Sequence, residues 1–173
     1  MLTGQALERF KRANRQSIIA GESPAPEITM PSAWPDAHWK RYRDVGQRVL
    51  TSMSIAREDK ESRKRHYEDM YYLYDAPCAI IICVDRSLSI EYAMLDIGLI
   101  SQTICLSAQA RGIGSCIMAA TVSFPRHLRK ILPITEDKTV VIGLVLGYPD
   151  EDSPINGFTR ARASLDEMVT WVE

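Results

Sequence analysis

The sequence predicts an α+β or α/β sandwich in which helices cover both faces of a central sheet. The first half of the chain shows helical amphipathic patterns. The second half alternates apolar β-branched runs with helical segments. The chain has 173 residues, of which 46% are hydrophobic and 25% charged, and this suits one domain with a sizeable core.

The N-terminal half is predicted to contain three helices. Residues 3–20 are expected to form a helix, because they carry a loose apolar stripe and Thr3 ahead of it is a suitable N-cap. Residues 21–35 contain four of the nine prolines, which forbid a helix and predict an extended surface segment. Two strongly charged helices are then expected at 36–55 and 60–74.

Three apolar runs predict strands in the C-terminal half. CAIIICVD at 78–85 reads as a buried strand, a second strand is expected at 115–120, and the run at 139–148 is the most strand-like. Gly112 and Gly114 follow a helical segment and precede a strand. They therefore predict a helix end and a turn rather than a dinucleotide-binding fingerprint.

Three helices are expected between and after these strands. The long helix at 90–111 is apolar on nearly all sides, so it must be central or buried by a second subunit. A short basic helix is predicted at 123–132, with Pro125 tolerated in its first turn. The closing segment at 164–172 is expected to be a short helix capped by its first residue, a serine.

Charge and cysteine placement exclude several classes of protein. The formal net charge of −1 gives no general electrostatic reason to bind nucleic acid or an anionic membrane. Four cysteines lie in apolar runs without the CxxC spacing of a zinc site or redox dithiol: Cys78, Cys83, Cys105 and Cys116. Without a disulfide framework or signal peptide, a reducing cytoplasm is expected.

The remaining titratable residues suggest little catalysis by side chains. His38, His66 and His127 lie among charged residues and read as solvated surface histidines, so neither a metal site nor a nucleophile–histidine pair is expected. Asp96, inside the apolar helix, is either a buried hydrogen-bonded carboxylate or a general acid–base, with the structural interpretation favoured. A thiol-dependent enzyme that uses Cys116 or Cys83 is a weaker alternative.

Two further groups are candidates for binding. Arg160 and Arg162 are two residues apart in a predicted extended segment, so both can point to the same side and grip one phosphate. From spacing alone, a solvated loop is the preferred interpretation. Tyr67, Tyr71 and Tyr74 lie on one predicted helix, where they either line a pocket or form a core or surface stripe.

Taken together, these segments resemble the FMN-dependent nitroreductase family in their order and approximate spacing. The resemblance is carried by DAPCAIIICVDR (75–86), LDIGLISQTICLSAQARGIGSCIMAA (95–120), PRHLRKILPI (125–134), TVVIGLVLGYPDEDSPIN (139–156) and TRARASLDEMVTWV (159–172). It implies one nitroreductase-like domain over 1–173, with a helical excursion at 35–74. It also implies a three-layer α/β/α sandwich around a mixed, mainly antiparallel sheet.

The resemblance assigns cofactor contacts to two groups of residues and requires no catalytic side chain. Arg160 and Arg162 match the basic tail residues that contact the FMN phosphate in the family. The loop Ile117, Met118, Ala119 and Ala120 matches the segment that lies along the isoalloxazine ring and presents backbone groups to it. Many members carry Glu-Gly where this chain has Ala119 and Ala120, so a side-chain hydrogen bond at Ala119 is not expected.

The implied function is an FMN-dependent NAD(P)H oxidoreductase that reduces nitro, quinone or related electrophilic small molecules. The resemblance also implies a homodimer, and the charge and cysteine placement described above predict that it is cytoplasmic and engages neither nucleic acid nor a membrane. In the family, a segment ahead of the first helix supplies further flavin contacts. We expect this chain to lack that segment, since Met1 falls where it would be ending. The alternative is a non-catalytic scaffold that dimerises but binds FMN weakly or not at all.

Overall fold

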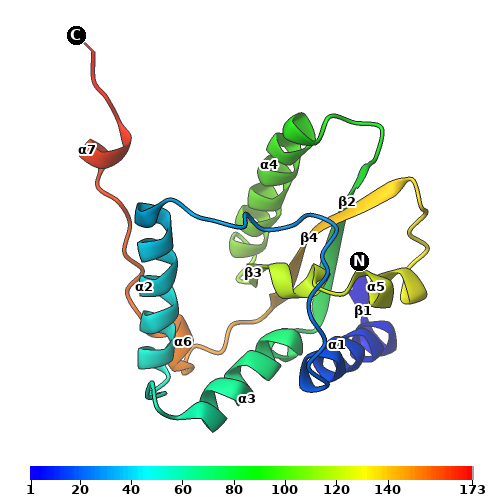
Figure 1. The fold of residues 1–173 in the computed structure, drawn as a ribbon, viewed down its shortest axis with the longest axis horizontal. Helices are drawn as coiled ribbons and strands as arrows, with labels where there is room; N and C mark the ends of the chain where they lie inside the picture. The colour runs from blue at the N-terminus through cyan, green and yellow to red at the C-terminus, as the bar shows by residue number, and fades with distance from the viewer. Residues whose placement is uncertain (173) are drawn as a thin grey trace. The chain divides into compact units, whose positions relative to one another are not determined.

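The computed structural model describes residues 1–172, and its centre is a four-stranded sheet (Figure 1). The strands are β1 (Leu2–Thr3), β2 (Cys78–Asp85), β3 (Gly114–Met118) and β4 (Lys138–Gly147). They lie in the order β1-β2-β4-β3. All three pairings are antiparallel, so the expected mixture of parallel and antiparallel pairs is not found among the described strands.

The two strongest strand predictions are confirmed. β2 and β4 pair from Cys78 opposite Leu146 to Asp85 opposite Lys138, with one irregularity in register after Ile82. Both are rich in β-branched residues, which suit the pleated and half-buried surface of a sheet. The short strand β1 was not predicted, because two residues carry no periodic pattern of their own.

The third predicted strand ends earlier than expected. β3 stops at Met118, and Ala119 begins a 3₁₀ turn, η2 (Ala119–Val122). The hydroxyls of Thr121 and Ser123 donate hydrogen bonds back to the carbonyls of Met118 and Ala119. Such local bonds offer the backbone an alternative to the strand ladder, so the chain leaves the sheet at this point.

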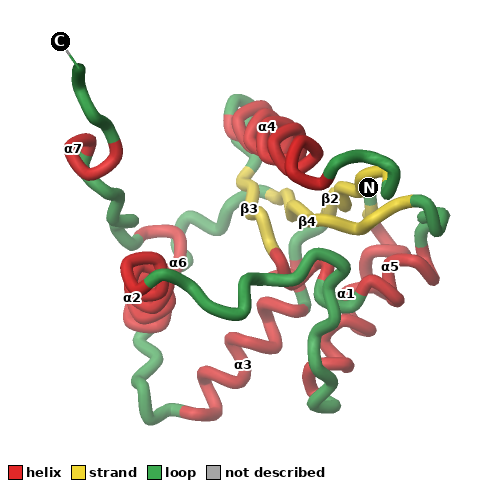
Figure 2. Tube along the Cα trace, turned by 45° about the horizontal axis from the view of Figure 1, so that its top comes forward, coloured by secondary structure: helices red, strands yellow, loops and turns green. Residues whose placement is uncertain are grey.

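Helices cover both faces of the sheet, as expected for three layers. The helices α1 (Gly4–Ile19), α3 (Lys60–Tyr71) and α5 (Pro125–Ile131) lie on one face. Figure 2 shows α4 (Ile90–Gln109) on the other face. These four helices confirm predictions to within a few residues at their ends.

The core lies between the sheet and the helices of the α1 face. Phe10, Leu73, Phe124, Leu128 and Val140 are fully buried there. By contrast, α4 leaves much of its apolar surface exposed in the described chain, because it packs on the sheet with one face only. None of the helices in residues 1–172 is both long enough and apolar enough to span a membrane.

The described chain divides into two compact units. The first contains Met1–Ser32 and Lys60–Pro149, and the second contains Ala33–Asp59 and the chain from Asp150 onward. Within the first unit, α3 packs on α1, where Arg15 pairs with Glu68 at 3.1 Å. The single domain over 1–173 and the excursion at 35–74 stay predictions.

The second unit contains α2 (Asp36–Ser52), α6 (Pro154–Gly157) and α7 (Leu165–Met168). Ser164 caps α7 with a reciprocal capping box, as its sequence predicted. The expectation that this helix reaches residue 172 is wrong. Val169 is already extended, with φ −125° and ψ 130°, and the β-branched residues there are weak helix formers.

One glycine couples the sheet to the turn after β3. Gly143 in β4 lies beneath Thr121, and a Cβ at position 143 would lie 2.7 Å from the Thr121 Cβ. We expect Gly143→Ala to displace η2 and to destabilise the protein by about 1–3 kcal/mol, the usual penalty for overpacking a well-packed site. Urea denaturation followed by circular dichroism would measure it.

Gly46→Ala is the matched control for that substitution. Gly46 lies inside α2, and nothing lies within 4 Å of a Cβ built there. Alanine at an open helical site should be neutral or stabilise by about 0.5–1 kcal/mol. Equal stability of the Gly143→Ala variant and the native protein would show that Thr121 can move without consequence.

Candidate functional site

The structure brings together four of the predicted cofactor-binding residues, Ile117 to Ala120. They carry the chain from the edge strand β3 into η2. The side chain of Ile117 is exposed, and so is Ala119, whereas Met118 and Ala120 are buried. The segment, called here the β3 loop, is therefore anchored in the core at two positions and accessible at the other two.

The carbonyl groups of the β3 loop are satisfied from inside the protein. Thr121 donates to the carbonyl of Met118 at 2.5 Å, and Ser123 donates to that of Ala119 at 3.2 Å. The Nδ2 group of Asn14 donates to the carbonyl of Ala120 at 3.0 Å. Three consecutive acceptors are thereby held away from any ligand.

The backbone amides of the same loop remain as donors. The first amides of a helical turn have no acceptor within that turn. Among residues 1–172, the amides of Ala119 and Ala120 also have no backbone acceptor elsewhere. Since alanine side chains offer no polar group, the loop presents amide N–H groups and a small apolar surface.

Asn14 links this loop to the end of α3. Its side chain is fully buried, and Nδ2 donates both to Ala120 and, at 2.9 Å, to the carbonyl of Tyr71. The sequence analysis missed Asn14. The sequence does contain a sign of this role, because Asn14 continues the buried stripe of Leu7 and Phe10 at helical spacing. A polar residue on a buried face requires hydrogen-bond partners.

A left-handed turn follows α3. Leu73, Tyr74 and Asp75 have φ values of +58°, +48° and +57°, a region that residues other than glycine seldom occupy. Leu73 is fully buried, and Asp75 forms an ion pair with Lys11 of α1. The turn therefore has one anchor in the core and one electrostatic anchor, with Tyr74 between them.

Lys11 is the centre of the polar network that holds this turn. Its side chain is only 6% exposed and also pairs with Glu8 at 3.3 Å. The Tyr72 hydroxyl donates to Glu8 at 2.6 Å, and its ring lies 4.7 Å from the Lys11 nitrogen. The hydrogen bond from Tyr72, followed by those from Arg12 and Lys11, lowers the pKa of Glu8 from its usual 4.5 to about 2.

The lowered pKa of Glu8 makes the fold sensitive to acid. A carboxylate whose pKa falls on folding stabilises the protein above its usual pKa, and that stability is lost as the pH falls from 4.5 towards about 2. Glu8→Gln should lower stability at neutral pH and flatten the pH dependence of unfolding in this range. The exposed Glu151→Gln is the control and should leave both unchanged.

Urea denaturation at several pH values between 2 and 7 would test the role of Glu8. A Glu8→Gln variant with the same acid sensitivity as the native protein would rule out the Tyr72–Glu8–Lys11 network as its source.

The two predicted phosphate contacts, Arg160 and Arg162, belong to the second unit. Both are exposed, and neither forms an ion pair within the described residues. The Arg160 guanidinium lies 4.9 Å from the ring centroid of Phe158, and Arg162 donates to the neighbouring carbonyl of Ala161 at 3.0 Å. Their positive charges are therefore uncompensated within residues 1–172.

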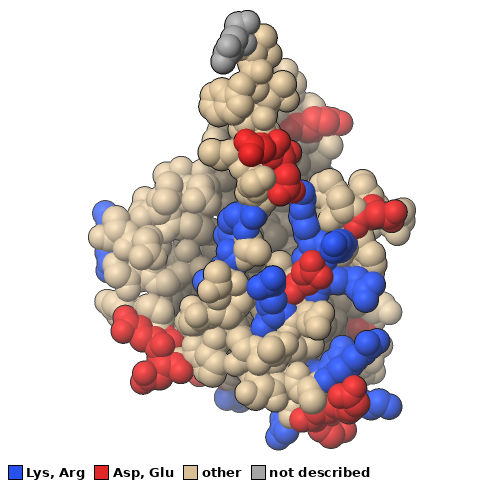
Figure 3. Space-filling model, turned by 90° about the vertical axis from the view of Figure 1, so that its left-hand side faces the viewer, with Lys and Arg blue, Asp and Glu red and all other residues tan. Residues whose placement is uncertain are grey.

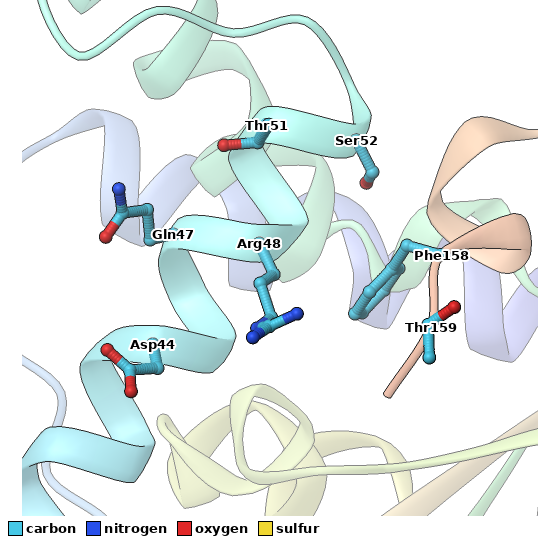
Figure 4. A pocket seen from close by; sticks show the side chains of 7 residues that line it. All are labelled: Asp44, Gln47, Arg48, Thr51, Ser52, Phe158 and Thr159. Carbon is cyan, nitrogen blue, oxygen red and sulfur yellow. The ribbon is translucent and has the colours of Figure 1, made fainter. Parts of the chain in front are cut away.

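A shallow pocket of about 530 Å³ lies in the second unit (Figure 4). Arg48 extends from α2 towards Phe158 in this view, and it has no ion pair in the described residues. The pocket is lined by Asp44, Gln47, Arg48, Thr51, Ser52, Phe158 and Thr159. A smaller pocket of about 280 Å³ in the first unit includes Glu27, which is already bound by Arg129 at 2.8 Å.

Charges of both signs are interspersed on the face shown in Figure 3, in keeping with the near-zero net charge.

His38 is exposed as predicted, but the surface interpretation is wrong for His66 and His127, which are half-buried. Burial lowers the pKa of both, and His127 lies 2.9 Å from the Ser17 hydroxyl. Residues 1–172 contain no group of three or more potential metal ligands.

The interpretation of Asp96 as a buried carboxylate is also wrong in the described chain. Asp96 is exposed on α4, and so are its apolar neighbours Leu95 and Leu99, each 61% accessible. The sequence shows only that this helix is apolar, and it cannot show which face remains uncovered. None of the four cysteines forms a disulfide within residues 1–172, and Cys116 is exposed directly before the β3 loop.

A model of the nitroreductase family matches residues 26–148. The chain belongs to the nitroreductase family. A 4-nitrobenzoate reductase from Nocardioides sp. (strain LMS-CY) is 29% identical to this nitroreductase over 143 residues, which are 82% of this chain and 58% of the relative. A chloronitrobenzene nitroreductase from Comamonas testosteroni is 29% identical over 175 residues, covering 99% of this chain and 76% of the relative.

Solved structures show the same fold for this nitroreductase. The FMN- and NADPH-dependent nitroreductase NfnB from Sphigopyxis sp. strain HMH superimposes with a TM-score of 0.91 at 26% identity, over 99% of this chain and 78% of that one. The FMN-dependent nitroreductase NfnB from Mycobacterium smegmatis gives a TM-score of 0.90 at 22% identity. The α+β sandwich is therefore that of the nitroreductase family.

Proposed function

We propose that this nitroreductase binds FMN and passes electrons from NAD(P)H to nitroaromatic or related electrophilic small molecules. The observation that carries the proposal is the β3 loop, whose carbonyls are bonded inward while its amides stay free to donate. Relatives named for the reduction of 4-nitrobenzoate and chloronitrobenzene support a nitroaromatic acceptor.

The residues present suit an isoalloxazine ring. The polar edge of that ring carries carbonyl oxygens and ring nitrogens that accept hydrogen bonds, and the amides of Ala119 and Ala120 are donors without a competing acceptor. Ile117 supplies an exposed apolar side chain beside them. When bound, FMN supplies the redox chemistry, whereas the chain supplies binding, orientation and electrostatics.

The phosphate of FMN is assigned to Arg160 and Arg162. Both guanidinium groups are accessible and carry uncompensated charge in the described chain. Arginine suits this role because its planar group can donate two parallel hydrogen bonds to phosphate oxygens. Arg160 and Arg162 are therefore the proposed phosphate contacts, whereas Ile117 to Ala120 are the proposed ring contacts.

We also infer a homodimer whose interface includes α4. Its exposed surface contains Leu95, Leu99, Ile100 and Leu106, each 48% to 61% accessible. A contiguous apolar surface of this kind on one helix is typical of a protein–protein interface. The four cysteines form no disulfide among the described residues, which fits the proposed cytoplasmic location, because thiols stay reduced there.

Replacing the arginine pair tests the phosphate assignment. Arg160→Ala with Arg162→Ala removes two charge-assisted contacts worth about 1.5–3 kcal/mol each, so FMN affinity should fall about 100-fold or more. Turnover at saturating FMN should change much less. Fluorescence titration of FMN measures the affinity, and NAD(P)H oxidation with nitrobenzene measures turnover.

Arg43→Ala is the matched control, since Arg43 is an exposed arginine on α2 outside the proposed contacts. It should leave FMN affinity unchanged. If the double variant binds FMN as tightly as the native protein, the two arginines are not phosphate contacts. If the native protein retains no FMN at all, the chain is the non-catalytic scaffold considered above.

Leu99→Glu tests the proposed interface. Burying an unpaired carboxylate at the centre of an apolar contact has a large desolvation cost, so the variant should be monomeric by light scattering. Ile19→Glu is the control, because Ile19 is similarly exposed at 54% but ends α1 on the opposite face of the sheet. A native protein that is already monomeric would refute the homodimer.

A further inference from the structure

The left-handed turn after α3 holds three strained residues in a row. A residue other than glycine in this conformation is strained and persists only where its surroundings determine it. Leu73 is fixed by the core, and Asp75 is fixed by Lys11. The amide of Ala76 closes the turn with a 3.0 Å bond to the carbonyl of Leu73. The residue that these anchors position is Tyr74.

Tyr74 lies close to the β3 loop. Its ring centroid is 5.9 Å from that of His66, and ionised Cys116, the residue before Ile117, is among the charges that raise the pKa of its phenol. Asn14 bonds to the carbonyls of both Tyr71 and Ala120, which fixes the end of α3 relative to the loop. Tyr74 is therefore held beside the segment proposed to contact the flavin ring, with 43% of its surface accessible.

Among the described residues, the side chains recorded against that of Tyr74 are His66, Cys116 and Asp69, none of which is a permanent cation. Burial, followed by the neighbouring Cys116 and Asp69, raises the pKa of Tyr74 to about 12, so its hydroxyl stays a neutral donor. Burial also lowers the pKa of His66, which favours its neutral form. The nearest cations of α1 are already paired, Lys11 with Asp75 and Arg15 with Glu68.

We propose that Tyr74 contacts the electron acceptor and makes this enzyme selective for uncharged nitroarenes over nitroarenes that carry a carboxylate. The electron-rich phenol ring suits stacking on an electron-poor nitroarene, and its hydroxyl donates to a nitro oxygen. A carboxylate on the substrate would meet no free cation there and would lose solvation without compensation. This proposal rests on the proposed nitroreductase function.

Binding without turnover gives the first test. Calorimetry of the purified full-length protein with nitrobenzene should show Tyr74→Phe weakening the affinity about two- to tenfold, the usual effect of one hydrogen bond. Tyr74→Ala, which also loses the ring, should weaken it further. Tyr67→Phe is the matched control, because Tyr67 lies on the preceding helix α3 and is exposed to a similar degree, 45% against 43%, and it should bind nitrobenzene as the native protein does.

Steady-state kinetics give the second test. The native enzyme should show at least tenfold higher kcat/KM for nitrobenzene than for 4-nitrobenzoate. Tyr74→Arg should reverse this preference, and Tyr74→Phe should raise KM for nitrobenzene. In each variant, FMN affinity should stay within about twofold of the native value.

The two proposals fail in different ways. Absence of FMN binding and of NAD(P)H oxidation would refute the nitroreductase function, whereas calorimetry would still report on Tyr74. Normal flavin chemistry with nitrobenzene affinity and acceptor preference unchanged in the Tyr74 variants would refute the role of Tyr74 alone. A fall in melting temperature with proportional loss of FMN would show that Tyr74 is merely structural.

Discussion

Two hydrogen bonds from one buried side-chain amide connect the parts of this chain that matter for its proposed function. Asn14 donates to the carbonyl of Tyr71, 57 residues away, and to that of Ala120, 106 residues away. Losing either bond would leave a buried carbonyl unsatisfied, which is costly in a core. The helix α1, which carries Asn14, therefore fixes both the turn that holds Tyr74 and the β3 loop, whose backbone amides are the proposed donors to the cofactor.

The direction of the polar groups explains how a loop without polar side chains can form the proposed cofactor site. Thr121, Ser123 and Asn14 occupy the carbonyls of the β3 loop, so its amides are the groups left for a ligand. This arrangement depends on Gly143, whose missing side chain leaves room for Thr121. Replacement of the family's common Glu-Gly pair by Ala119 and Ala120 is tolerable, because backbone donors do not depend on the side chain.

The cationic side chains of the two units differ in whether they form ion pairs. In the first unit, Lys11 and Arg15 are paired with carboxylates and stabilise the contact between α1 and the end of α3. In the second unit, Arg160 and Arg162 remain unpaired among the described residues. Paired cations hold the fold and offer little to an anion, whereas unpaired ones can bind a phosphate.

The sequence by itself determined the main helices, the strands β2 and β4 and the family, because long periodic patterns report which face of an element is buried. It also singled out Ile117 to Ala120 and the arginine pair by resemblance. Only the tertiary structure decided the pairing of β1, the early end of β3, the left-handed turn at Tyr74, and the exposure of Asp96. Each depends on contacts between residues far apart in the chain, which no local pattern records.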